Sequence, residues 1–357
     1  MLKRHWLIFI ASLLIALAVI YLVRVYYTQK NYYSVLAVTG ATPKVLSQPL
    51  PENIALTING LVSREYKFSS QALAAFATSS IRTKEMSAQG EFIGAYTYVG
   101  IPLYNILEGI EPKKPEQASF NKPLDLIVSV KSATGKIVNF TYNELLMTDD
   151  SLPVTLAFYR QEILPYKDPD QYNHNKYKDN IKGLKLIAPR DPDTARYLDD
   201  VVEITIAPIS LPEHLLPKVQ KGLKCDADSL NIIDDKNVGK ANYDNVKKNS
   251  VSNWIRIGHG QGYKSISKAS GFNLRSFLKK NFPDYNLDDY FLFVGCDGYR
   301  ALFSARELFL NKNSESYLIL DQLDGQLPMG KIMLAAIDDF FVDRDVWGLS
   351  HVVRISQ

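Results

Sequence analysis

The sequence predicts an α+β fold, with two tandem domains behind an N-terminal transmembrane helix. Two observations support this prediction. A strand–turn–strand–helix pattern over 289–308, DYFLFVGCDGYRALFSAREL, has an earlier counterpart within 124–146, LDLIVSVKSATGKIVNFTYNELL. In addition, an uncharged apolar run over 6–23 is just long enough to cross a bilayer as a helix. The first observation indicates a duplicated unit, and the second indicates an anchor.

The recurring pattern combines a tight turn with a helix start. Asp297-Gly298 predicts the turn, because glycine adopts positive φ without a Cβ clash and apolar runs flank it. Six residues later, Ser304 and Glu307 have the spacing of a capping box, in which the serine oxygen accepts the amide of the third helical residue. The aligned pairs are Gly135 with Gly298, Phe140 with Phe303, Thr141 with Ser304, Glu144 with Glu307 and Leu145 with Leu308. A turn and a cap that recur at one spacing predict tandem copies.

The N-terminal segment 1–27 is predicted to be an uncleaved signal anchor. Lys3 and Arg4 precede the apolar run, so the N-terminus is expected in the cytoplasm and the bulk of the chain in the periplasm or outside the cell. The alternative is a cleaved signal peptide with a long apolar region. No small-x-small cleavage site follows the run in Arg24-Val25-Tyr26-Tyr27. We therefore expect a single-pass membrane protein.

The remaining chain divides by composition and by the order of its predicted elements. The proline-containing stretch 28–53 predicts a tether. The predicted units are a first domain over 54–208, a linker and polar loop over 209–250, and a second domain over 251–357. In the first domain we expect strands at 55–60, 96–103, 152–158 and 199–206. We also expect one helix at 71–76 and a second, short helix that ends near Leu107. The second domain repeats this order, with strands at 254–257, 317–320 and 351–355 and a helix within 271–278.

Bulk composition excludes some classes of function. With 41 basic and 38 acidic residues the net charge is +3, so no field favouring nucleic acid is expected. The two cysteines, Cys225 and Cys296, could form one disulfide outside the cytoplasm or stay free and buried. No H-E-x-x-H, C-x-x-C or G-x-S-x-G motif occurs. The sequence therefore predicts neither a metal site nor a catalytic residue.

The order of short motifs resembles a known family. In the first domain the motifs are Ile58-Asn59-Gly60-Leu61-Val62, Gly100-Ile101-Pro102-Leu103, Leu156-Ala157-Phe158 and Gly183-Leu184-Lys185-Leu186-Ile187-Ala188-Pro189. In the second they are Asp297-Gly298-Tyr299, Asp324-Gly325-Gln326-Leu327-Pro328, Gly330-Lys331 and 346–355. Both domains resemble the sulfite-oxidase-type molybdopterin-binding domain. The resemblance covers most of 54–357 and implies two tandem, divergent copies of that domain.

One departure from that family concerns its metal ligand. The family holds molybdenum through a cysteine thiolate between the first helix and the Gly-x-Pro-Leu motif, because a soft thiolate suits the oxidised metal. The intervals 60–100 and 253–271 contain no cysteine. Neither Cys225 nor Cys296 occupies the ligand position. The resemblance thus implies the fold. Because the thiolate ligand is missing, no cofactor is expected; the cofactor that the resemblance would imply is molybdopterin.

Two groups of residues are candidate binding sites. The resemblance places Lys185, Arg190 and Arg196 where family members set basic groups against the pterin phosphate, although solvation of surface charges is the competing interpretation. The loop after the expected strand 254–257 offers alternating glycines and basic groups that could oppose an anion, with a flexible solvated turn as the alternative. Its candidate ligand-binding residues are Arg256, Gly258, His259, Gly260, Gly262 and Lys264.

Three functions follow from these observations. The first is a membrane-anchored extracytoplasmic binding or assembly module, non-catalytic, with a possible envelope redox or assembly partner. The second is a molybdopterin-dependent oxidoreductase that exchanges electrons with a membrane quinone or a cytochrome. The third is a receptor for an anion or small ligand at the loop 256–264. The missing cysteine favours the first.

Overall fold

The computed structural model describes residues 50–148, 151–163, 181–210, 226–234, 237–311 and 315–357. The predicted anchor 1–27 and most of the tether 28–53 lie outside these residues. Within the described ranges, no helix combines the length and apolar character needed to span a membrane. The residues from Leu50 to Gln357 belong to one compact unit.

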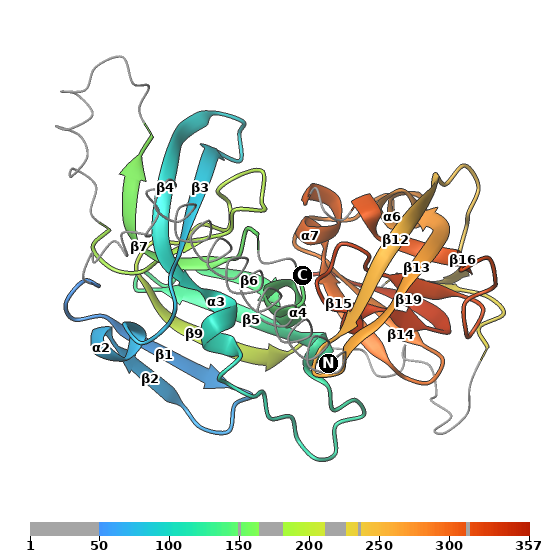
Figure 1. Ribbon diagram of the computed structural model, residues 1–357, viewed down its shortest axis with the longest axis horizontal. Helices are drawn as coiled ribbons and strands as arrows, with labels where there is room; N and C mark the ends of the chain where they lie inside the picture. The colour runs from blue at the N-terminus through green and yellow to red at the C-terminus, as the bar shows by residue number, and fades with distance from the viewer. Residues whose placement is uncertain (1–49, 149–150, 164–180, 211–225, 235–236, 312–314) are drawn as a thin grey trace, which may run out of the picture. The chain divides into compact units, whose positions relative to one another are not determined.

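The described chain is mostly β, so the predicted α+β class is wrong. Strands account for 47% and helices for 13%, and the strands form four separate sheets (Figure 1). The longest described helix, α6 (Leu274–Asn281), has eight residues. The other helical elements are α2 (Ser70–Leu73), α3 (Leu103–Leu107), α4 (Tyr142–Leu146), α7 (Ala305–Leu310) and the 3-10 turns η1 (Pro123–Asp125) and η4 (Val342–Arg344).

The reason for this error is physical. Correctly placed helix starts do not predict helix length, because a cap satisfies only the first amides of a helix. The stretches between the caps are rich in β-branched and aromatic residues, which favour strands. The hairpin of β3 (Ser79–Met86) and β4 (Phe92–Pro102) illustrates this, since the sequence predicted only part of its second strand.

The first half of the described chain contains two sheets. One has the order β2-β1-β9-β5-β6, and the other has the order β3-β4-β7-β8. In the first sheet β1 and β9 are parallel and the other neighbours are antiparallel. The bounds of the strands not yet given are β1 (Ala55–Gly60), β2 (Tyr66–Ser69), β5 (Leu126–Ser132), β6 (Ile137–Thr141), β7 (Thr155–Glu162), β8 (Lys185–Ile187) and β9 (Val201–Pro208).

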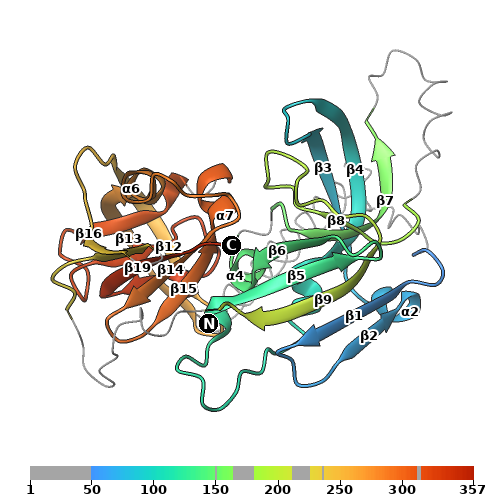
Figure 2. The same cartoon turned by 180° about the vertical axis from the view of Figure 1, so that it is seen from behind.

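The second half also contains two sheets, drawn in yellow to red in Figures 1 and 2. Their orders are β11-β10-β19-β14-β15 and β12-β13-β16-β17-β18. The segment 209–250, predicted as linker and polar loop, contributes β10, β11 and the start of β12 to them. The bounds are β10 (Asn231–Asp234), β11 (Asn237–Lys240), β12 (Lys248–Gly258), β13 (Gly262–Asn273), β14 (Tyr290–Gly295), β15 (Arg300–Ser304), β16 (Leu318–Leu323), β17 (Met333–Ala335), β18 (Val346–Trp347) and β19 (Leu349–Ile355).

The two halves share one pattern of strand pairing. In the second half β10 and β19 are parallel, and β11, β14 and β15 add antiparallel neighbours, as in the first five-stranded sheet. The register shifts also correspond, between Lys131 and Ser132 in β5 and between Val294 and Gly295 in β14. The strand order, the strand directions and this irregularity therefore match between the two five-stranded sheets of the pattern β2-β1-β9-β5-β6 and β11-β10-β19-β14-β15.

Each half encloses an apolar core between its two sheets. In the first half Ile58, Val128 and Ile204 are fully buried, and in the second Phe291 and Phe303 are. The opposite face of the second five-stranded sheet is buried too, where Leu292 and Val353 pack with Ile127 and Ile209 from the first half. Burial on both faces explains why β14 is a continuous apolar run.

Two equivalent glycines allow neighbouring strands to approach closely. A Cβ on Gly100 would lie 2.4 Å from the Leu156 carbonyl oxygen, and a Cβ on Gly271 would lie 2.2 Å from that of Ile319. Both glycines stand at register shifts, between β4 and β7 and between β13 and β16. Backbone atoms cannot rotate aside, so each position requires glycine.

We predict that Gly271→Ala lowers the free energy of unfolding by about 1–3 kcal/mol, because the methyl group overpacks the β13–β16 contact. Urea unfolding measures this change. The matched control is Gly239→Ala on β11, where a Cβ would meet no atom within 4 Å. Equal stability of the two variants would contradict the close approach at Gly271.

Candidate functional site

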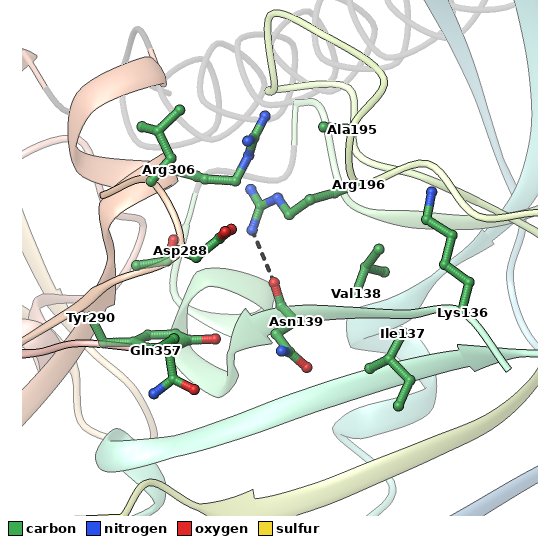
Figure 3. A pocket seen from close by; sticks show the side chains of 12 residues that line it. Lys136, Ile137, Val138, Asn139, Ala195, Arg196, Asp288, Tyr290, Arg306 and Gln357 are labelled. Carbon is green, nitrogen blue, oxygen red and sulfur yellow. Dashed lines mark hydrogen bonds between the residues drawn. The ribbon is translucent and has the colours of Figure 1, made fainter. Parts of the chain in front are cut away.

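The candidate site is a pocket of about 380 Å³ where β6 and the loop around Arg196 face β15 and α7 (Figure 3). Its two sides come from the two halves of the described chain. Lys136, Asn139 and Asp288 supply exposed polar groups at this pocket. A volume of this size suits a small molecule, for which pockets of about 300–1,000 Å³ are usual.

The floor of the pocket is the guanidinium of Arg196, whose side chain is 7% exposed. It bonds Asp191 through Nε at 2.7 Å and Nη2 at 2.6 Å, and Glu144 through Nη2 at 2.6 Å and Nη1 at 3.1 Å. Nη1 also donates to the Asn139 carbonyl at 3.4 Å, the dashed line of Figure 3. An arginine has five N–H donors. All five are therefore committed within the protein.

Two carboxylates fix the charge of this arginine. Burial acts to lower the pKa of Arg196, but Glu144 and Asp191 raise it well above its ordinary value. The guanidinium also lies 4.2 Å from the centre of the Phe140 ring. Arg196 is thus held by hydrogen bonds, charge and an aromatic face together.

The second half of the chain reaches this network through β15 and α7. Ser304 Oγ donates to Glu144 Oε2 at 3.2 Å. Arg306 donates to Asp193 at 2.7 Å and lies 3.8 Å from Asp191. The two capped helices therefore meet across one polar network.

The predicted helix starts at these two positions are confirmed. Thr141 Oγ1 accepts the Glu144 amide at 3.1 Å, and Ser304 Oγ accepts the Glu307 amide at 3.1 Å. The carboxylates of both glutamates bond to arginines, a role that the capping-box interpretation did not include.

A second buried network has the same charged residues as the first, one arginine with an aspartate and a glutamate, and adds a tyrosine. Arg344 bonds Asp339 at 2.5 and 2.6 Å and Glu307 at 2.5 Å, and it lies 4.3 Å from the centre of the Phe303 ring. Tyr317 Oη accepts a further bond from it at 2.9 Å. Burial, together with the charges of Glu144 and Asp339, raises the pKa of Glu307 to about 7 against the opposing effect of Arg344. The two networks thus influence each other electrostatically.

The other two predicted cofactor residues lie apart from the pocket. Lys185 forms an ion pair with Asp199 at 2.7 Å. Arg190 donates to the Leu152 carbonyl at 3.3 Å and lines a separate cavity of about 390 Å³ with Lys84 and Asn311. Arg190 Nη2 is buried without a hydrogen-bond partner among the described residues. Of the three predicted residues, the structure brings only Arg196 to the pocket in Figure 3.

The predicted ligand loop is the tip of the β12–β13 hairpin. Gly258 pairs with Gly262, and Gly260 and Gly262 have positive φ, which the turn requires. The His259 amide donates to Asp343 at 2.8 Å. The centre of the His259 ring lies 4.9 Å from the centre of the Phe341 ring. Lys264 is exposed beside Gly258. Anion binding by this loop stays a prediction.

Arg256 on β12 packs against two tryptophans and a buried carboxylate. Its guanidinium lies 4.9 Å from the Trp254 ring and 5.2 Å from the Trp347 ring, and 3.7 Å from Asp345. Trp254 Nε1, Arg256 Nε and Asp345 Oδ2 are buried with no hydrogen-bond partner in the described part of the chain. Burial raises the pKa of Asp345 to about 8, although the Ala336 amide and Arg256 act to lower it.

Neither a free thiol nor a metal-binding group of side chains is found among the described residues. Cys296 is disulfide-bonded, and the chain has one other cysteine, Cys225, which lies outside the described residues. Within the described ranges, no group of three His, Cys, Asp or Glu side chains is placed to hold a metal ion.

Sequence reasoning missed Lys136, Asn139, Asp288 and Arg306 at the pocket. They come from segments far apart in the sequence, and the Arg306–Asp193 pair joins positions that are 113 apart. A local signal was available only for the arginine networks, because an aspartate precedes the arginine by five residues in both halves.

Comparison with known proteins identifies no family. No protein-family model matches the chain, and no curated protein matches it in sequence. Among solved structures, the sulfane dehydrogenase SoxCD from Paracoccus pantotrophus is similar at 17% identity and a TM-score of 0.31. The match covers 68% of this chain and 57% of that chain, so this chain spans little more than half of that protein's length. A likeness this distant carries no argument about function.

We predict that stability falls as pH rises from about 4 to about 8, in part through Asp345. The folded-state pKa of this carboxyl is raised to about 8 from an ordinary 3.8, so the folded state binds the proton more tightly across that window. Asp345→Asn removes the titration. The free energy of unfolding of the variant should exceed that of the parent by roughly 1–3 kcal/mol at pH 8, and the two values should match near pH 4.

Urea unfolding between pH 4 and 8 measures both proteins. Asp284→Asn, at an exposed position, is the control and should follow the parent curve. A parallel loss of stability in the parent and in Asp345→Asn would contradict the buried proton.

Proposed function

We propose that this protein is a non-catalytic, membrane-anchored binding module of the extracytoplasmic space, built from two divergent sulfite-oxidase-type units. One observation carries the proposal. Arg196, the residue that the family resemblance implies for the cofactor phosphate, already donates all its N–H groups to protein oxygens. Its charge stabilises the fold and is not available to an anionic cofactor.

The residues present do not fit molybdopterin. The thiolate is missing from both intervals where the family places it, and Cys296 is disulfide-bonded. Lys185 is paired with Asp199, and Arg196 is paired with two carboxylates. We therefore assign no reaction step to that cofactor.

Support for two related units comes from the pairing of the strands and from the repeated polar network. Both five-stranded sheets share order and direction. Each half also has one buried cluster beside a phenylalanine. The cluster consists of a glutamate from the first turn of a capped helix, an arginine and an aspartate. A duplication explains why such a cluster recurs with the same five-residue spacing.

The proposed ligand of the module occupies the 380 Å³ pocket. Lys136 and Asp288 offer opposite charges there, and Asn139 and Gln357 add amides. Arg196, held by hydrogen bonds to two carboxylates and to the Asn139 carbonyl, also lines this pocket. A small polar molecule with both donors and acceptors suits such a lining.

The proposed location rests on the apolar run 6–23 and on Cys296. A disulfide persists in oxidising compartments and is rare in the cytosol. The bonded state of Cys296 therefore favours a position outside the cytoplasm, on the far side of the predicted anchor.

The alternative is a molybdopterin-dependent oxidoreductase, and one observation favours it. Arg190 presents a buried Nη2 without a hydrogen-bond partner among the described residues, at a cavity of about 390 Å³ that Lys84 also lines. Two cations at one cavity could oppose a phosphate.

Metal and pterin analysis of protein purified from its native host separates these functions. The module should carry molybdenum and pterin far below one equivalent per chain. A molybdopterin enzyme purified in parallel from the same cells is the control for cofactor retention. One equivalent of both in this protein would overturn the proposal and establish the alternative.

A further inference from the structure

A further polar cavity, of about 340 Å³, lies on another part of the molecule. Lys114, Asp125 and Arg300 line one wall, and Phe120, Pro208 and Ile209 contribute apolar surface. The three charged side chains are 7%, 5% and 10% exposed. The wall is therefore a buried charged cluster and not a solvated surface.

The three groups share one carboxylate. Arg300 Nε and Nη2 both approach Asp125 Oδ2 at 2.7 Å, while Lys114 Nζ bonds Asp125 Oδ1. Lys114 also donates to the Phe120 carbonyl at 3.0 Å. Both oxygens of Asp125 are thus occupied by cations.

The cluster has one more cation than carboxylate, so its net charge is positive. Two cations face a single carboxylate in a wall that is at least nine-tenths buried. Burial lowers the pKa of Lys114, and Arg300 lowers it further, against the opposing effect of Asp125. A buried charge without a counter-charge is costly, so this wall favours an anion.

The aromatic neighbours reduce this cost without removing the charge. Lys114 and Arg300 lie 5.0 and 5.1 Å from the centre of the Phe120 ring. Cation–π contacts stabilise a cation but provide no negative charge.

The other buried networks have the opposite balance. Arg196 and Arg344 are each opposed by two carboxylates. Among these three clusters, only the one around Asp125 has more cations than carboxylates. A structural role alone explains the first two, whereas the third leaves a positive charge facing a cavity.

We infer that this cavity binds an organic monoanion whose carboxylate or similar group lies against Lys114 and Arg300 and whose apolar body lies against Pro208 and Ile209. The single excess charge sets the charge of the ligand, and the mixed wall sets its amphipathic character. The inference goes beyond the proposed function, because it concerns a different cavity and holds for either cofactor content.

Calorimetric titration of the full-length protein with benzoate tests the inference. Benzamide, which has the same shape without the charge, is the matched ligand control. Benzoate should bind saturably and at least about tenfold more tightly than benzamide, as a charge-assisted contact requires. Equal affinities, or no benzoate binding, would overturn the inference.

A substitution within the cavity supplies the second arm. Ser119 lines the cavity and is exposed. Ser119→Asp can therefore provide the missing negative charge without removing a buried side-chain contact. It should weaken benzoate binding by about tenfold or more, whereas Ser119→Asn should stay within about twofold of the parent. Thermal unfolding shows that both variants are folded.

Removal of the cation gives the complementary result. Lys114→Gln should weaken benzoate binding by about tenfold, and Lys122→Gln, beside Tyr299, should leave it unchanged. If Lys114→Gln does not fold, the Ser119 pair decides. Unchanged benzoate affinity in Ser119→Asp would refute the site whatever the metal and pterin content of the protein.

Discussion

The buried pairing of Arg196 with Glu144 and Asp191 is the interaction on which much of the structure depends. A guanidinium removed from water is costly unless its charge and its donors are satisfied. Here the charge is met by carboxylates from α4 and from the loop after β8, and the remaining donor bonds the Asn139 carbonyl of β6. The same carboxylates receive Ser304 and Arg306 from the other half, so the network also connects the halves.

The equivalent network around Arg344 makes this connection electrostatic as well as steric. The charge of Glu144 contributes to the raised pKa of Glu307, although burial contributes more. The apolar packing of Leu292 and Val353 with Ile127 joins the halves at another face. The candidate pocket therefore lies in a rigid setting, which suits a site that holds a ligand without rearranging.

Local signals in the sequence predicted local structure well. Gly135 and Gly298 have positive φ of 87° and 84°, as the predicted turns require, and Thr141 and Ser304 cap helices. The fold class was wrong because caps fix where a helix begins but not how far it continues. Of the long β12–β13 hairpin, the sequence predicted only a strand at 254–257, because many of its residues are polar and few positions of β12 are buried, so the apolar alternation is weak.

The candidate sites were harder to predict, for a different physical reason. Arg300 meets Asp125 across 175 positions, and Arg196 meets Glu144 across 52. No spacing rule reports such pairs, because only the tertiary fold brings them together. The resemblance singled out Arg196 for a cofactor phosphate, a role that stays a prediction, and it gave no sign that two carboxylates would occupy the donors of this arginine.

A double-mutant cycle between Arg196 and Glu144 tests the central claim, that this arginine is a structural group saturated by carboxylates. Urea unfolding compares Arg196→Met, Glu144→Gln, the double variant and the parent. Arg196→Met should cost about 3–5 kcal/mol, because it leaves two buried carboxylates without their cation. Glu144→Gln should cost less, about 1–3 kcal/mol, because Asp191 still pairs with Arg196. The double change should cost less than the sum by about 2–3 kcal/mol. Losses that add within about 0.5 kcal/mol would show that the two groups are independent, and would contradict the account.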